Sequence, residues 1–115
     1  MALNKANRLS DKKDFDLVFK KGSAVKGNFL FIRSRDNNKN VSRFGFSIPT
    51  KVVSRAVIRN RLKRIFSKTA SQYISQEFKG KDVVLVVIKK GDEKIMNSEF
   101  EKLLNKSSIF QNTNK

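Results

Sequence analysis

The amino-acid sequence predicts one α+β domain, an α/β sandwich with a mostly antiparallel sheet and the order helix, strand, strand, helix, strand, helix. At 115 residues the chain is long enough for one hydrophobic core but not for two. After Asp82 it reads VVLVVI, an apolar run typical of a central strand that is buried on both faces. Residues 56–78 before that strand carry apolar side chains at helical spacing, which predicts one long amphipathic helix.

The first third of the chain predicts a basic arm followed by a short helix. Residues 1–8 carry Lys5 and Arg8 and have no periodic apolar pattern, so we expect a flexible basic arm, and the sequence leaves open whether it becomes ordered on binding. Ser10 is a suitable N-cap, and the helix then runs to about residue 20. Phe15, Val18 and Phe19 share one face of this helix, which favours a core position for both phenylalanines.

Residues 28–36 and 41–48 predict two strands of an antiparallel hairpin, joined by the polar turn DNNKN. Leu30 and Ile32 share one face of the first strand. The other face carries aromatic and basic side chains: Phe29, Phe31, Arg33 and Arg35. Aromatic rings interleaved with arginines suit stacking of unpaired bases and binding of phosphates. Packing of these rings beneath the first helix is an equally good interpretation, and both stay open.

The end of the chain predicts a last amphipathic helix from about residue 97. Its apolar face is formed by Phe100, Leu103, Leu104 and Ile109 and would cover the sheet. Residues 111–115 are expected to fray. Repeats and linkers are absent from the sequence, so residues 1–115 are expected to form one domain.

Composition indicates an anionic partner and argues against catalysis by the chain alone. The 26 Lys and Arg residues outnumber the 10 Asp and Glu residues, and the net charge of +16 calls for a polyanion that neutralises it. Histidine and cysteine are both absent, which removes the commonest zinc ligands and the commonest general base. The acidic residues form no close cluster in the sequence that would hold a pair of metal ions. A free-standing nuclease is therefore the least favoured function.

The sequence also bears on location. No apolar run approaches the roughly 20 residues of a membrane span, and residues 1–10 lack the apolar core of a secretory signal. We therefore expect a cytoplasmic protein without a membrane partner.

Residues 51–68, KVVSRAVIRNRLKRIFSK, have the chemistry of a polyanion-binding helix, with seven basic residues and no acidic one. Ser54 is a plausible N-cap. An apolar stripe faces the core and comprises Ile58, Leu62, Ile65 and Phe66, continued by Thr69 and Tyr73. Arg59 and Arg61 point to opposite flanks, so the helix reaches several phosphates at once, and Asn60 suits a phosphate or a 2′-hydroxyl. A merely solvated surface is a weak alternative because acidic partners at i+4 are absent.

These residues resemble a known signature. The run GFSI at 45–48, followed by Lys51, Arg55 and the triplet Arg59-Asn60-Arg61 with Lys63-Arg64, resembles the bacterial ribonuclease P protein component, whose hallmark is the RNR motif. The segments NRL at 7–9 and DFDLVFKKG at 14–22 resemble the N-terminal part of the same family. Thr50 and Ser67 stand where family members often have basic residues.

The resemblance implies a subunit of ribonuclease P, in which a catalytic RNA removes the 5′ leader of precursor tRNA. It also implies a left-handed crossover around the long helix, whereas sheet chirality alone would predict a right-handed one. The catalytic RNA would be bound by Lys51, Arg55, Arg59, Asn60, Arg61, Lys63, Arg64 and Lys68. The leader would lie in a cleft formed by Phe15, Phe19, Phe31 and Arg33.

The resemblance also bears on metal ions and on activity. By resemblance, Mg²⁺ would be bound mainly by the RNA and not by the protein alone, the isolated protein would be inactive, and DNA is not an expected partner. Charge and size alone suit a non-catalytic RNA-binding protein of another ribonucleoprotein, such as the ribosome, equally well. The RNR motif favours the ribonuclease P subunit.

Overall fold

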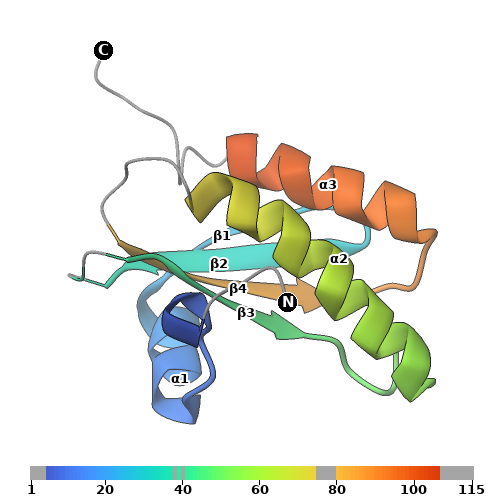
Figure 1. Ribbon diagram of the computed structural model, residues 1–115, viewed down its shortest axis with the longest axis horizontal. Coiled ribbons are helices and arrows are strands. Elements are labelled where there is room, and N and C mark those ends of the chain that lie inside the picture. Colours follow the sequence, from blue (N-terminus) through green and yellow to red (C-terminus); the bar gives the residue numbers. More distant parts are fainter. Residues whose placement is uncertain (1–4, 38, 40, 75–79, 107–115) are drawn as a thin grey trace.

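Four strands form one sheet, with one helix on one face and two helices on the other (Figure 1). The computed structural model describes residues 5–37, 39, 41–74 and 80–106. A 3₁₀ turn at Lys5–Asn7 is followed by α1 (Lys12–Lys21), β1 (Ser23–Lys26), β2 (Leu30–Asp36), β3 (Arg43–Ser47), α2 (Ala56–Ile74), β4 (Lys81–Val87) and α3 (Glu93–Lys106). The strand order is β1-β2-β4-β3, and only the β3–β4 pair is parallel. The predicted α+β class with a mostly antiparallel sheet is confirmed.

The predicted hairpin between β2 and β3 is wrong, because β4 lies between these two strands. Leu85 of β4 faces Ile32 of β2 on one side and Phe46 of β3 on the other. The central place buries the apolar run of β4 on both faces, as its sequence predicts, and an edge position would expose it. The parallel β3–β4 pair, connected through α2, is the predicted crossover unit.

The short strand β1 was not predicted. Its sequence SAVK is too short to show an alternating pattern, and the flanking Gly22 and Gly27 read as turns. β1 pairs antiparallel with β2, where Val25 faces Ile32. The actual hairpin of this sheet is therefore β1–β2, at the sheet edge opposite β3.

The N-terminal segment departs from the predicted flexible arm. Asn7 is buried, and its side-chain amide donates a hydrogen bond to the carbonyl of Ser42 at 2.9 Å. Arg8 pairs with Phe44, and the amide of Leu9 donates to the Phe44 carbonyl at 2.9 Å. Residues 5–9 thus lie along the outer edge of β3, while residues 1–4 are outside the described residues.

The main core lies between the sheet and the pair α2 and α3. The predicted stripe of α2 is confirmed, with Leu62 and Phe66 almost fully buried. Phe66 packs edge-on against Phe100 of α3, with ring centroids 5.6 Å apart. Phe100, Leu103 and Leu104 are buried as predicted, whereas Ile109 and the tail 111–115 lie outside the described residues.

Two predicted element ends, the N-cap of α1 and the start of α3, shift by a few residues. The N-cap of α1 is Asp11 rather than Ser10, since the Asp11 carboxylate accepts a hydrogen bond from the Lys13 amide at 3.1 Å. α3 begins at Glu93 rather than near 97, because Asp92 accepts hydrogen bonds from the first turn of this helix. α2 begins at Ala56, and the predicted end near 78 lies outside the described residues.

Candidate nucleic-acid interface

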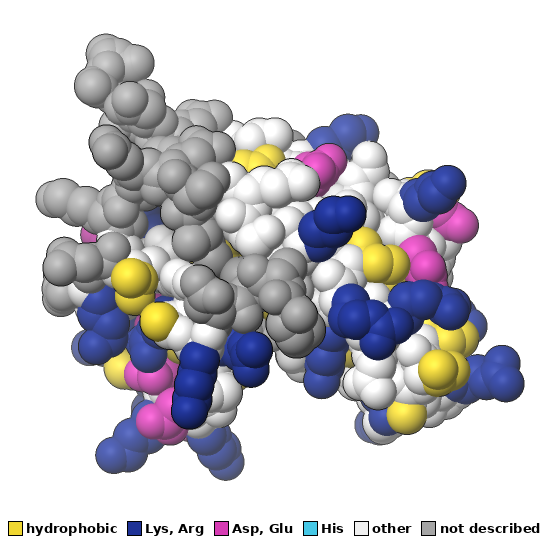
Figure 2. Space-filling view, viewed as in Figure 1, with side chains coloured by type: hydrophobic (Ala, Val, Ile, Leu, Met, Phe, Trp, Pro, Cys, Tyr) yellow, Lys and Arg dark blue, Asp and Glu magenta, His cyan; other side chains and the backbone are white. Residues whose placement is uncertain are grey.

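One surface of interest is the outer side of α2. The carbonyl of Arg55 accepts the first helical hydrogen bonds, from the amides of Ile58 and Arg59, so Ser54 lies one residue before the capping position. The sequence-predicted side chains of α2 and of the segment that leads into it are exposed, with the exception of Arg59: Lys51, Arg55, Asn60, Arg61, Lys63, Arg64 and Lys68. Figure 2 shows Lys and Arg side chains gathered over the α2 side of the molecule, with a few Asp and Glu side chains beside them. We call this surface the basic face.

The two arginines of the RNR motif contact different neighbours, in line with the predicted opposite flanks. Arg59 is half-buried, and its Nη1 donates to the carbonyls of Val53 at 3.0 Å and Ser54 at 2.8 Å. These bonds fasten the entry of α2 to the helix. Arg61 Nε donates to Oε2 of Glu93, at the start of α3, at 2.6 Å.

Glu93 is an acidic partner that the sequence did not reveal. Residues 51–68 contain no acidic residue, and Glu93 lies 32 residues beyond Arg61 in the chain. The Arg61 side chain is half exposed in this ion pair, so the contact is weak and open to competition from a phosphate. Arg61 therefore keeps a defined orientation toward α3 without being withdrawn from the surface.

The opposite face of the sheet carries the predicted aromatic residues. Strand register places Phe31 beside Val86 on the same side of the sheet as α1. Phe15 packs against the small core of Leu9, Val18 and Val84, and it is half-buried like Phe31. Phe19 is 39 % exposed. We call Phe15, Phe19, Phe31 and Arg33 the aromatic face.

A glycine allows Phe15 to lie against the sheet. A Cβ atom at Gly45 would stand 2.5 Å from Cζ of Phe15 and 3.0 Å from the carbonyl oxygen of Leu9. Any side chain at Gly45 would therefore displace the Phe15 ring or the N-terminal segment. The glycine of the GFSI run thus positions one ring of the aromatic face.

Arg33 has a structural role that the sequence did not indicate. Its Nη2 donates to the carbonyls of Phe19 at 2.7 Å and Gly22 at 3.0 Å, at the C-terminal end of α1. A cation is favourable there because the carbonyl ends of the helix carry partial negative charge. The guanidinium carbon also lies 5.9 Å from the centroid of the Phe19 ring. Arg33 therefore holds the end of α1 and the Phe19 ring in place on the aromatic face.

Phe29 does not belong to the aromatic face. The alternation of 29, 31 and 33 predicted that the three side chains share one side, but β2 begins only at Leu30. Phe29 lies in the turn before the strand, where its carbonyl accepts hydrogen bonds from the amides of Ile88 and Lys89. Its ring packs against the main core instead.

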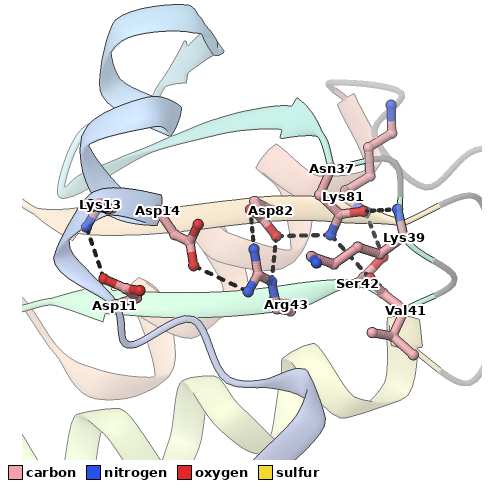
Figure 3. Close-up of polar contacts among 10 residues, drawn as sticks. All are labelled: Asp11, Lys13, Asp14, Asn37, Lys39, Val41, Ser42, Arg43, Lys81 and Asp82. Atoms are coloured by element: carbon pink, nitrogen blue, oxygen red, sulfur yellow. Dashed lines mark hydrogen bonds and ion pairs between the residues drawn. The ribbon is translucent and has the colours of Figure 1, made fainter.

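A buried ion pair fixes α1 on the sheet (Figure 3). Arg43 of β3 donates two hydrogen bonds to the fully buried carboxylate of Asp82, at 2.9 and 2.7 Å, and one to Asp14 of α1 at 3.2 Å. The amide of Asn37 also donates to Asp82, at 2.8 Å. The hydrogen bonds to Asp82 raise the pKa of Arg43. This network sets the position of α1 and hence of Phe15, the residue that follows Asp14.

The described acidic residues do not form a metal site. No group of three or more Asp and Glu side chains comes together within the part of the chain that the structure describes. Asp14 and Asp82, which approach the same point, both face the Arg43 guanidinium. Nor is any helix among the described residues long and apolar enough to cross a membrane.

These features define a class of protein, a small and strongly basic α+β domain with a helix rich in exposed basic side chains on one side of its sheet and aromatic side chains on the other. The Ribonuclease P family profile matches residues 3–110. The chain belongs to this family, and is thus a subunit of the ribonuclease P holoenzyme, the endoribonuclease that matures the 5′ end of tRNA. The predicted family is confirmed. The chain is therefore a ribonuclease P subunit and not a protein of another ribonucleoprotein.

Relatives with this family name cover nearly the whole chain. The ribonuclease P protein component of Syntrophomonas wolfei is 34% identical over 98% of both chains, and that of Nostoc punctiforme is 32% identical over 96% of this chain and 97% of its own. The RNase P protein of Staphylococcus aureus shares the fold, with a TM-score of 0.83 at 23% identity, covering 93% and 100% of the two chains. That of Thermotoga maritima in complex with a thiourea has a TM-score of 0.74 at 28% identity, covering 84% and 96%.

Proposed function

We propose that the basic face binds the catalytic RNA of ribonuclease P and that the aromatic face binds the 5′ leader of precursor tRNA. The observation that supports this division most directly is that α2, which carries the basic face, and α1, which carries Phe15 and Phe19, lie on opposite sides of one sheet (Figure 1). A single rigid sheet between them would hold the two RNAs at a constant separation. The proposed RNA contacts of the basic face are Lys51, Arg55, Arg59, Asn60, Arg61, Lys63, Arg64 and Lys68.

The basic face suits a folded RNA because its cations are spread along and around α2. Arg59 and Arg61 are held toward different neighbours, so they would meet phosphates of different backbone segments. Each phosphate contact releases counterions from the RNA, which makes such binding strong at low salt and weak at high salt. Arginine also binds phosphate through two parallel hydrogen bonds, which gives the complex a defined geometry.

The aromatic face suits an unpaired strand because it offers ring surface beside a cation. Phe31 and Phe15 are half-buried, so each is seated in the fold while part of its side chain stays accessible. Single-stranded bases stack on such rings whatever their identity, which fits a leader of variable sequence. Arg33 would act mainly by keeping α1 and Phe19 in position, since its Nη2 already donates to two backbone carbonyls.

The proposed contribution to catalysis is electrostatic and positional. Precursor tRNA and catalytic RNA are both polyanions and repel each other, and a subunit with a net charge of +16 offsets that repulsion. Mg²⁺ ions would be bound mainly by RNA phosphates, because the described carboxylates do not gather into a site. We expect the isolated protein to cleave no precursor tRNA. Addition of a catalytic RNA of the ribonuclease P type should produce cleavage. In the cell, we expect the holoenzyme to act in the cytoplasm.

The leader proposal is tested with a Phe31→Leu variant of the reconstituted holoenzyme. Leucine keeps most of the apolar volume but removes the flat ring. Stacking of a base on such a ring contributes roughly 1–3 kcal/mol of binding free energy. Affinity for precursor tRNA should therefore fall about 5- to 150-fold, while affinity for mature tRNA should stay unchanged. Both affinities are measured by equilibrium binding at one fixed salt concentration.

Phe46→Leu is the matched control, since it makes the same chemical change on the opposite face of the sheet. Phe46 packs against Phe66, with ring centroids 6.1 Å apart, so this variant should lose stability but keep the preference for precursor tRNA. If Phe31→Leu instead lowers the melting temperature and leaves the preference intact, Phe31 is a core residue and the leader binds elsewhere.

A further inference from the structure

A pocket of about 790 Å³ opens between the turn that joins β1 to β2 and the outer side of α3. Its apolar part is formed by Phe29, Ile95 and Leu103. Ile95, in the first turn of α3, is 55 % exposed and so offers apolar surface to a ligand. One edge of the Phe29 ring lies against Gly91, where a Cβ atom would stand 2.5 Å from the ring. The pocket therefore has a seated aromatic ring on one side and an exposed aliphatic side chain on the other.

The charge around this pocket is positive. Three exposed lysines line it, namely Lys26, Lys94 and Lys102. The one carboxylate, Glu99, is occupied within the fold, because its Oε2 accepts hydrogen bonds from the amides of Phe29 at 2.8 Å and Leu30 at 3.0 Å. These bonds hold the β1–β2 turn against α3, and the three lysines outnumber the one carboxylate in the lining of the pocket.

The pocket and the basic face lie on different flanks of α3, and the first turn of this helix connects them. Glu93, the first residue of α3, bonds Arg61 of the RNR motif, and the next two residues, Lys94 and Ile95, line the pocket. A strand with one phosphate at Arg61 would cross the first turn of α3 to bring its next nucleotide to the pocket. The aromatic face lies on the other side of the sheet, so the two surfaces cannot share one nucleotide.

We propose that this pocket holds one unpaired nucleotide of the RNA that binds the basic face. Lysine ammonium groups would bind the flanking phosphates as point charges, and the base would rest among Phe29, Ile95 and Leu103. The volume lies in the range of pockets that bind small organic ligands. The inference rests on RNA binding by α2, as proposed above, but it is independent of leader binding by the aromatic face.

The test is methyl NMR of the full chain, with the signals of Ile95 and Leu103 as reporters. The probes are AMP, inorganic phosphate and the single-stranded hexanucleotide hexa-adenylate. The test variant is the double substitution Lys94→Ala and Lys102→Ala, which removes two rim charges and keeps strong helix formers on α3. The matched control is Lys89→Ala with Lys90→Ala, which removes the same charge at exposed positions outside the pocket.

AMP should shift the reporter signals saturably and inorganic phosphate should not. With about 0.7 counterions released per phosphate of a single strand, loss of two contacts should weaken hexa-adenylate binding at the reporters about 25-fold at 0.1 M salt. The control variant should bind as the parent protein does. Both variants are checked for an unchanged melting temperature.

Three results would overturn the inference. The first is that neither AMP nor hexa-adenylate shifts the signals of Ile95 and Leu103, and the second is that both double variants lose the same affinity for hexa-adenylate. The third is that inorganic phosphate and AMP shift the signals equally, which would leave only an anion site. Failure of the leader proposal appears separately, as an unchanged precursor preference in Phe31→Leu. If α2 does not bind the catalytic RNA, the affinity of the protein for this RNA will be unchanged in the Arg61→Ala variant.

Discussion

Replacing Arg43 by alanine should destabilise the fold through the carboxylate that it leaves behind. Asp82 is fully buried and accepts two hydrogen bonds from Arg43, at 2.9 and 2.7 Å. In the variant its one remaining partner in this network is the Asn37 amide at 2.8 Å. Removing one member of a buried ion pair costs roughly 3–5 kcal/mol, and the retained amide places the expected cost near the lower end, at about 3 kcal/mol. For a domain of this length that lowers Tm by about 12 °C.

The assay is urea unfolding of the RNA-free protein, followed by circular dichroism. Arg64→Ala is the control, since it removes the same charge from an exposed position and should change stability by less than about 0.5 kcal/mol. Adding Asp82→Asn to Arg43→Ala should restore part of the loss, because the stranded charge is gone. A cost of less than about 1 kcal/mol for Arg43→Ala, or a double variant no more stable than the single one, would refute the reasoning.

Three further outcomes follow from the described contacts. Glu93→Gln frees Arg61 from its ion pair, so the affinity for catalytic RNA should rise by up to about fivefold. Filter binding at a series of salt concentrations measures this affinity, and an unchanged value would place Arg61 outside the interface. Leu62→Ala, at a position 1 % exposed, should cost roughly 2–5 kcal/mol in urea unfolding; a cost near zero would contradict its core position. Burial, with a smaller contribution from Glu101, raises the pKa of Tyr73 above its ordinary value of 10.0, so the stability from the neutral phenol is lost as pH rises from about 10 through the raised value. Tyr73→Phe should flatten that alkaline fall in Tm, and parallel curves for the two proteins would argue against it.

Elements with a long, regular pattern were predictable from the sequence. β4 shows an unbroken apolar run, and α2 and α3 carry apolar side chains at helical spacing, so type, approximate extent and buried face follow from local chemistry. The basic side chains of α2 were placed correctly for the same reason, since the buried stripe determines which positions remain outside. Membership of the family rests on the RNR motif and its spacing from the GFSI run, both of which are local features.

Pairing between distant segments was not predictable in this way. The two strand-like segments around the turn DNNKN look like a hairpin, but β4 gains more burial by lying between them. The partners of Arg61, Arg33 and Arg43 come from other elements of the fold. The sequence around each arginine therefore does not show which of them form ion pairs or hydrogen bonds within the protein. One signal was present for the last of them: a charged Asp82 at the head of a buried run calls for a cation nearby.

The central place of β4 also sets the order in which the sheet can form. Arg43 and Asp82, which pair across β3 and β4, are 39 residues apart, and Glu99 reaches back 70 residues to Phe29. During synthesis the β1–β2 hairpin and the β3 segment leave the ribosome with no strand to join them. Closing such long loops costs chain entropy before any contact repays it, so folding should be slow for a domain of this size. The sheet is completed only when the last third of the chain has emerged.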